Sequence, residues 1–129
     1  MRYQALVGIT MLTCCNSAVT GKAPTPTEEF VSGCKTVVEA IDEGKSAEGF
    51  NPGFCLGIVV GMLDGLDAAG GVVNGVKRVC IPQDRDAMVI VRKIVAISVE
   101  QPELVKEAKP SVLAAIAVIQ KFTCDQPQG

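Results

Sequence analysis

Cysteine offers the most chemistry in this chain of 129 residues, which contains six cysteines and no histidine. A thiolate can act as a nucleophile, bind a metal ion or form a disulfide. Without histidine, neither a Cys–His nor a Ser–His catalytic arrangement can form. Zinc is disfavoured because no two cysteines have the Cys-x-x-Cys spacing that places two ligands on one turn. The thiols are therefore predicted to form disulfides, and we expect no metal and no cofactor.

The N-terminal residues indicate export to a compartment in which disulfides form. Met1-Arg2 supplies a positive charge, and residues 5–12 form a short apolar run. Small residues follow at Ala18 and Ala23, which are the candidate cleavage sites. This pattern is typical of a secretory signal peptide, here residues 1–23.

An alternative for the same segment is a lipoprotein signal, with a lipid anchor at Cys14 or Cys15. A third is that no signal is removed. The apolar run is too short to span a membrane, because a membrane-spanning helix takes about 20 apolar residues. Cleavage after residue 23 leaves a single mature domain, residues 24–129. We therefore expect the protein in the periplasm, with an outer-membrane lipoprotein as the alternative.

The composition favours a small domain with an aliphatic core. Hydrophobic residues make up 48% of the chain but aromatic residues only 4%, so a domain of this size gains from covalent cross-links. The net charge is −2, and removal of the signal takes away two basic residues and no acid, which leaves about −4. A chain this acidic is not suited to binding nucleic acid.

Apolar periodicity and capping signals predict four helices in the mature domain. The first follows a capping box, and the second runs to about Ala68. The predicted helix starts are at or near Pro26, Asn51, Arg85 and Lys109. Pro102-Glu103 begins a further turn or short helix. The predicted fold is all-α: a small four-helix domain with two disulfides and a glycine-rich loop or short hairpin between helices two and three.

Four cysteines lie in the mature domain: Cys34, Cys55, Cys80 and Cys124. Four cysteines allow three pairings. If helices one and two are antiparallel, Cys34 comes close to Cys55. If helices three and four are antiparallel, Cys80 comes close to Cys124. This arrangement favours disulfides Cys34–Cys55 and Cys80–Cys124.

Glycine recurs at every fourth position in the second predicted helix. The three glycines are Gly57, Gly61 and Gly65. Each costs about 0.5–1 kcal/mol relative to alanine. We predict that they form a smooth stripe against which another helix packs closely, so that dispersion contacts offset the cost. A ligand groove beside the stripe is the alternative.

Two further patterns bear on catalysis. Asp64 and Asp67 share a helical face and are candidates for an acid pair or half of a cation site; the alternative is that they are solvated or helix-capping carboxylates. Gly44-Lys45-Ser46 resembles the end of a phosphate-binding loop, but Glu39 stands where that motif needs glycine. We therefore expect no enzyme activity.

The segment between helices two and three carries the predicted partner-binding residues. Asn74-Gly75 between β-branched residues is a hairpin signal. The predicted partner-binding residues are Asn74, Lys77 and Arg78. Their segment is anchored by helix two at one end and by Cys80 at the other. Because both ends are held, the segment can bind a partner with little loss of conformational entropy. If the segment is an ordinary connection, the contact surface is expected at residues 42–50 or 100–103.

The spacing of several motifs is similar to that of a known family. Cys55, Gly57, Gly61 and Asp64 form Cys-x-Gly-x-x-x-Gly-x-x-Asp, followed by Cys80-x-Pro82, Pro102-Glu103 and Cys124. This layout resembles the Rap/Tai family of type VI secretion amidase immunity proteins over residues 55–124. The chain departs from the family at Ile58, where an aromatic residue is common, and in having Val79-Cys80-Ile81-Pro82 for a Phe-Cys-Leu-Pro-like stretch.

The resemblance implies a periplasmic, all-helical protein, often a homodimer. Family members bind a secreted peptidoglycan amidase and block its active-site cleft, and such occlusion needs no catalytic residue in the inhibitor. The alternative function is a periplasmic helical binding or acid-stress chaperone-like module without a cognate toxin.

Overall fold

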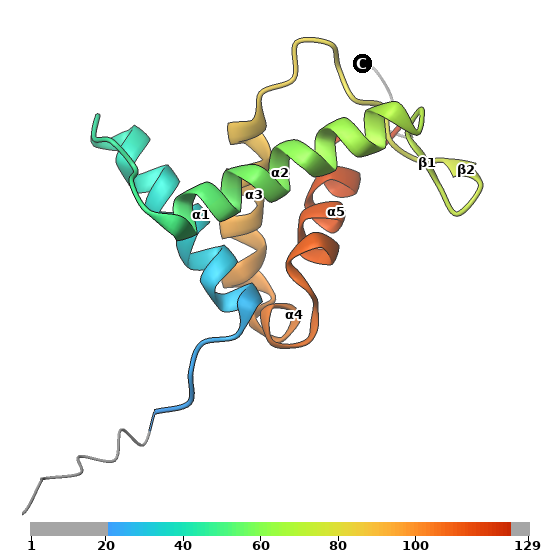
Figure 1. Ribbon diagram of the computed structural model, residues 1–129. Helices are drawn as coiled ribbons and strands as arrows, with labels where there is room; N and C mark the ends of the chain where they lie inside the picture. Colours follow the sequence, from blue (N-terminus) through green and yellow to red (C-terminus); the bar gives the residue numbers. More distant parts are fainter. Residues whose placement is uncertain (1–20, 125–129) are drawn as a thin grey trace, which may run out of the picture.

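The computed structural model describes residues 21–124. The predicted signal peptide falls almost wholly outside these residues, as do Cys14 and Cys15. Within them the chain forms five helices and one small antiparallel hairpin (Figure 1). In chain order these are α1 (Pro26–Asp42), α2 (Phe50–Ala68), β1 (Val72–Val73), β2 (Val76–Lys77), α3 (Ala87–Glu100), α4 (Pro102–Glu107) and α5 (Pro110–Lys121).

The predicted helical fold is confirmed. Residues 21–124 contain the four predicted helices and a fifth, at the place where the sequence predicted a further turn or short helix. Pro102-Glu103 begins α4, a separate helix of six residues. Ala108 and Lys109 are extended and separate α4 from α5. A residue before proline avoids the helical region, which is why the chain cannot continue as one helix into Pro110.

Two helix starts show how side chains set the boundaries. Thr25 and Glu28 form the predicted capping box of α1: the Thr25 hydroxyl accepts from the Glu28 amide at 3.1 Å, and the Glu28 carboxylate accepts from the Thr25 amide. At α3 the helix begins at Ala87, two residues later than predicted. Asp84, which directly precedes the predicted start at Arg85, does not cap this helix. The N-cap is Asp86, whose carboxylate accepts from the Met88 amide at 2.9 Å.

The core lies between α1, α2, α3 and α5. Helix α2 crosses α3 and α5 and contacts both, while α4 lies at the opposite end of the molecule (Figure 1). Phe30 is the only aromatic residue among the fully buried large side chains of residues 21–124, so the core is aliphatic as predicted. The other large members are Val59, Val79, Ile90, Val91, Ile94, Ile97, Leu113 and Val118. None of the described helices is long and apolar enough to cross a membrane.

Two disulfides connect these elements. Cys34 of α1 is bonded to Cys55 of α2, and both side chains are fully buried. Cys80, which follows the hairpin, is bonded to Cys124, which follows α5. This is the pairing that the antiparallel arrangement predicts. Disulfides of this kind are consistent with an oxidising, exported compartment.

The predicted packing of a helix on the α2 glycines is wrong within this chain. Gly57, Gly61 and Gly65 are all exposed, and a Cβ atom added at any of them would meet no atom within 4 Å. The reason is that α2 turns Cys55 and Val59 towards the core. Residues two positions from these point to the opposite side of a helix, which faces outwards here.

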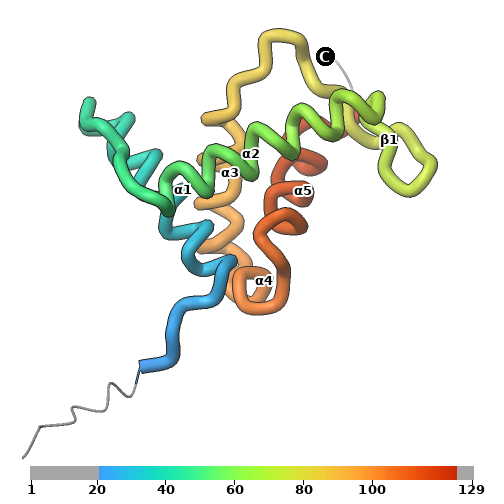
Figure 2. Tube along the Cα trace, viewed as in Figure 1, coloured from blue at the N-terminus to red at the C-terminus, as the bar shows by residue number. Residues whose placement is uncertain are grey.

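The tube in Figure 2 shows how the chain returns from the hairpin to α3. Residues 78–86 arch over from the end of α2 before α3 begins.

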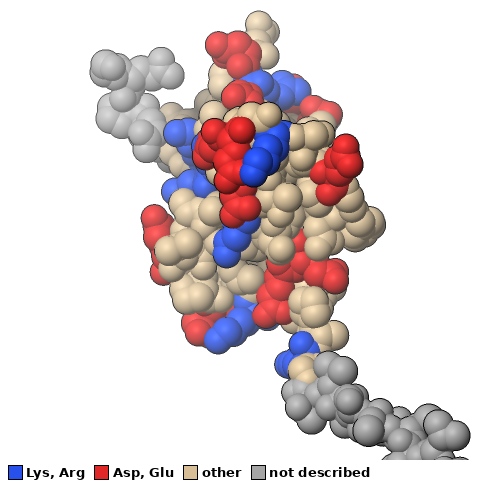
Figure 3. Space-filling view, turned by 90° about the vertical axis from the view of Figure 1, so that its left-hand side faces the viewer, with Lys and Arg blue, Asp and Glu red and all other residues tan. Residues whose placement is uncertain are grey.

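On the face drawn in Figure 3, acidic and basic side chains are interspersed, and no continuous basic surface is visible there. That face therefore lacks the electrostatic surface that a phosphate backbone requires.

Candidate functional site

The segment that was predicted to bind a partner folds as a narrow hairpin. Val72 pairs with Lys77 and Val73 with Val76, so the turn consists of Asn74 and Gly75 alone. Both turn residues have positive φ, 52° and 75°. A two-residue turn with positive φ at both positions matches the twist of the flanking strands, and Asn-Gly suits it best. The hairpin alternative of the sequence prediction is thus confirmed.

The base of the hairpin is held by backbone hydrogen bonds. The carbonyl of Gly71 accepts from the amides of Arg78 and Val79, at 3.0 and 3.1 Å. Gly71 has a φ of 73°, and a Cβ atom there would overlap the Val79 carbonyl oxygen. Both the backbone conformation and the close approach therefore require glycine at this position.

The segment after the hairpin is joined to the C-terminal end of α5. The amide of Cys80 donates a hydrogen bond to the carbonyl of Phe122 at 2.7 Å. The amide of Cys124 donates to the carbonyl of Arg78 at 3.2 Å. Val79 forms a β-bridge with Thr123 and is buried, with 1% of its surface exposed. The Cys80–Cys124 disulfide links the same two segments. The hairpin therefore projects from a base that is fixed by hydrogen bonds, burial and a covalent bond.

The projecting part combines apolar and cationic groups. Val72 and Val76 are 42% and 51% exposed, and Asn74, Lys77 and Arg78 are also exposed. None of the ion pairs found among residues 21–124 involves Lys77 or Arg78. The structure thus places Asn74 and Lys77 in the hairpin and Arg78 at its base, beside two exposed valines that the prediction did not include.

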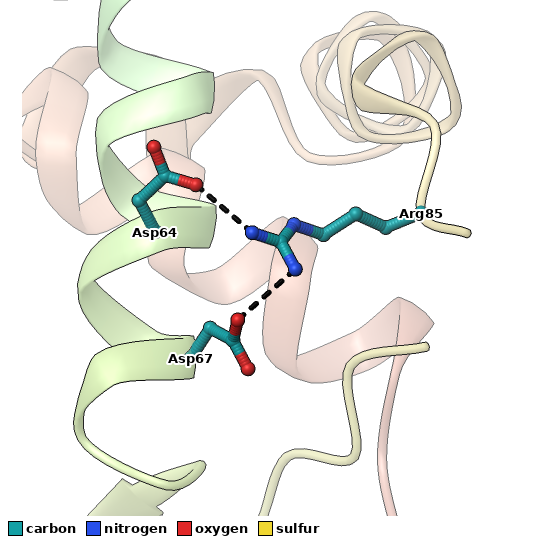
Figure 4. A network of polar contacts seen from close by, with 3 residues as sticks. All are labelled: Asp64, Asp67 and Arg85. Atoms are coloured by element: carbon teal, nitrogen blue, oxygen red, sulfur yellow. Dashed lines mark hydrogen bonds and ion pairs between the residues drawn. The ribbon is translucent and has the colours of Figure 1, made fainter. Parts of the chain in front are cut away.

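Next to the hairpin, Arg85 is held between two acids of α2 (Figure 4). Its Nη2 atom lies 3.0 Å from Asp64 Oδ1, and its Nη1 atom lies 3.0 Å from Asp67 Oδ2. The hydrogen bond to Asp64, reinforced by the charge of both acids, raises the pKa of Arg85. The two carboxylates are therefore not an isolated acid pair and cap no helix. Both side chains remain more than half exposed, as the solvated alternative predicted, and their ion pairs with Arg85 join residues 78–86 to α2.

Sequence reasoning did not identify Arg85. It lies 18 and 21 residues from its two partners, so no helical or hairpin spacing connects them. The one sequence feature that pointed to such a partner was the presence of Asp64 and Asp67 on a single helical face. Two neighbouring acids favour a nearby cation, but their spacing does not identify which lysine or arginine supplies it.

The two other candidate contact surfaces are less well suited to enter a cleft. In the segment before α2, Asp42 is engaged by Arg92, whose Nη2 lies 2.6 Å from Asp42 Oδ1. Phe50 is 76% exposed and stacks on Phe54 with ring centroids 5.6 Å apart. Residues 100–103 only join α3 to α4, where Glu103 is paired with Lys106. Residues 42–50 also extend from the body of the molecule (Figure 1), but unlike the hairpin and its base they form no strand pair and contain no disulfide.

Among residues 21–124, no group of three or more His, Cys, Asp or Glu side chains is placed to hold a metal ion. Comparison with known proteins found no family model, no curated protein and no solved structure that matches the chain. The resemblance to the Rap/Tai family therefore rests on motif spacing alone.

Proposed function

We propose that this chain is a periplasmic immunity-type protein that binds a type VI secreted peptidoglycan amidase and occludes its active site. The single observation that carries the proposal is the hairpin of residues 72–77 on its fixed base. The resemblance in motif spacing supplies the partner class. The disulfides support export, and the periplasm is the oxidising compartment proposed.

The hairpin has the physical properties that occlusion needs. Two strands joined by a two-residue turn make a narrow projection that fits a concave site. Because the base is already ordered, binding sacrifices little conformational entropy. Val72 and Val76 offer apolar area for the centre of the contact. Lys77 and Arg78 have no acidic partner among the described ion pairs, so no internal pair must break on binding.

The mechanism is steric. Asn74 and Gly75 at the turn would enter the cleft first, and the valines would displace water from its walls. Lys77 and Arg78 would contact polar groups at the rim, where charge contributes to orientation and association rate. No bond is made or broken in this mechanism, so the inhibitor needs no catalytic group.

The test is inhibition of purified papain-like amidases by the exported, oxidised protein. Release of soluble fragments from peptidoglycan sacculi is measured at rising inhibitor concentration. The variant Asn74→Ala/Lys77→Ala/Arg78→Ala is expected to weaken inhibition at least about tenfold, as expected when central contact residues are truncated. The matched control Lys35→Ala/Lys109→Ala, which removes two exposed cations elsewhere, is expected to inhibit as well as the parent.

Two outcomes would count against the proposal. If the triple variant stays folded and inhibits fully, the hairpin is a connection and the contact surface lies at residues 42–50 or 100–103. If the parent protein inhibits no amidase from its own organism or its competitors, the function as an immunity protein is wrong. A binding module without a cognate toxin would then be the better description.

A further inference from the structure

The two disulfides differ in their exposure to solvent. Cys34 and Cys55 both have 0% of their surface exposed, and their bond lies in the core between α1 and α2. Cys80 is exposed and its partner Cys124 is half-buried. A disulfide is broken by a thiolate, which must first reach one of the two sulfur atoms. The folded protein therefore leaves the Cys80–Cys124 bond open to attack and closes the other bond to it.

Cys80 also lines a hollow of about 260 Å³ that gives an incoming group room to approach. The hollow lies between the C-terminal end of α2 and the base of the hairpin, and its charged side chains are Asp67 and Lys77. Asp67 is paired with Arg85, whereas none of the ion pairs found among residues 21–124 involves Lys77. A cation without an acidic partner favours the approach of an anion, and the attacking thiolate is an anion.

We propose that the Cys80–Cys124 bond is a site of thiol–disulfide exchange in the folded protein, with a dithiol of the Cys-x-x-Cys class as the reductant. The first thiolate of the dithiol attacks Cys80, which is the more exposed of the two cysteines. A bond forms between its sulfur and Cys80 Sγ, and the electron pair of the broken bond leaves on Cys124 Sγ, which takes up a proton.

The second thiol of the reductant completes the exchange. It attacks the reductant's own sulfur in the mixed disulfide and releases Cys80 as a thiolate, which takes up a proton. In total the chain gains two electrons and two protons, and the dithiol becomes a disulfide. The inference does not depend on the proposed amidase partner.

The exchange loosens the hairpin base and leaves the first two helices joined. Reduction removes the covalent link between residues 78–80 and 122–124, which remain connected by two backbone hydrogen bonds. Hydrogen bonds at the surface open locally at little cost. The hairpin of residues 72–77 therefore becomes more mobile, while the buried Cys34–Cys55 bond keeps α1 attached to α2. Reoxidation restores the fixed base.

The first test compares the two disulfides in the full chain, exported and oxidised, with dithiothreitol as the probe. Samples are quenched with acid, and the free thiols are alkylated and located by mass spectrometry of peptides. In the folded protein Cys80 and Cys124 are expected to become free at least about tenfold faster than Cys34 and Cys55, because only the first pair is accessible. The control is the same reaction in concentrated urea, where both pairs are accessible and the two rates are expected to converge.

The second test identifies the attacked sulfur. The probe is thioredoxin in which serine replaces the second cysteine of its Cys-x-x-Cys motif, because this protein stays bonded to the cysteine that it attacks. The adduct is expected on Cys80. Lys77→Gln is expected to slow its formation several-fold, because the cation of the hollow is lost. Lys109→Gln, which removes an exposed lysine before α5, is the matched control and is expected to leave the rate unchanged.

Four results would overturn the proposal. One is release of both pairs at equal rates in the folded protein. A second is a rate difference that persists in urea, which would trace it to local sequence and not to burial. A third is an adduct on Cys124 instead of Cys80, which would reject the proposed order of attack. The fourth is loss of the helical circular dichroism as the Cys80–Cys124 bond is reduced, because exchange would then require an unfolded chain.

Discussion

Gly33 of α1 lies directly against the main-chain carbonyl of Asn51 in the first turn of α2, and a Cβ atom at Gly33 would overlap that oxygen. The next residue, Cys34, is bonded to Cys55 one turn further along α2. The two helices are therefore in backbone contact and covalently joined at the same place. The close approach that we expected at the α2 glycines is made by a glycine of α1.

Alanine substitution at two helical glycines should have opposite effects. Gly33→Ala is expected to lower the free energy of unfolding by about 1–3 kcal/mol, because the methyl group must displace backbone. Gly61→Ala is expected to raise it by up to about 1 kcal/mol, because it improves helix propensity in open space. Urea unfolding at low protein concentration, where a dimer would not contribute, measures both. Equal effects would contradict the packing described for α1 and α2.

Removing each disulfide should have a distinct local effect. In the loop-entropy model, Cys34→Ala/Cys55→Ala and Cys80→Ala/Cys124→Ala cost about 3 and 4 kcal/mol respectively. Only the second pair should also accelerate hydrogen exchange of the Val79 and Cys80 amides relative to the helices, because it releases the hairpin base. Exchange followed by NMR makes the comparison, with the first pair as control. Uniform acceleration would mean that the hydrogen bonds alone hold the base.

The turn of the hairpin should tolerate one substitution and reject another. Gly75 has a φ of 75°, which a β-branched residue adopts only with strain. Gly75→Val is therefore expected to abolish the cross-strand NMR contacts between Val72 and Lys77 while the helical circular dichroism is unchanged. Asn74→Gly, which accepts positive φ freely, is the control and should preserve these contacts. Loss of helix signal in Gly75→Val would mean that the hairpin supports the whole fold.

The ion pair between Asp42 and Arg92 should make stability sensitive to acid. The hydrogen bond from Arg92 lowers the pKa of Asp42 from its ordinary value of 3.8. A carboxyl group with a lowered folded-state pKa stabilises the fold fully above its unfolded-state value, and this contribution is lost as the pH falls below 3.8 through the lowered pKa.

Arg92→Gln is therefore expected to be less stable than the parent at neutral pH and to approach it in strong acid. Lys93→Gln removes the neighbouring cation, which forms no ion pair among the described residues, and serves as the control. Urea unfolding across the acid range measures the difference. A constant difference between Arg92→Gln and the parent at every pH would show that the pair does not contribute.

Local chemistry determined much of this protein before any tertiary contact was considered. The capping box at Thr25 starts α1, Asn74-Gly75 forms its turn from backbone preference alone, and the order of helices around four cysteines pointed to the disulfide pairing. These features depend on neighbours within a few residues, or on simple antiparallel packing. The start of α3 lies at Ala87 and not at the predicted Arg85. Asp84 and Asp86 are both residues of the type that caps a helix, and sequence alone does not tell which one accepts the hydrogen bond.

Only the tertiary structure decided which side of α2 faces the core. Because α2 has apolar residues on all sides, its periodicity carries no information about direction, and the glycine spacing suggested the wrong side. The Cys34–Cys55 bond and the contact at Gly33 orient the helix instead. The partner of Asp64 and Asp67 was equally hidden, because the arch that carries Arg85 reaches them through space. Spacing along one helix identifies a shared face, but what that face meets depends on how the rest of the chain packs.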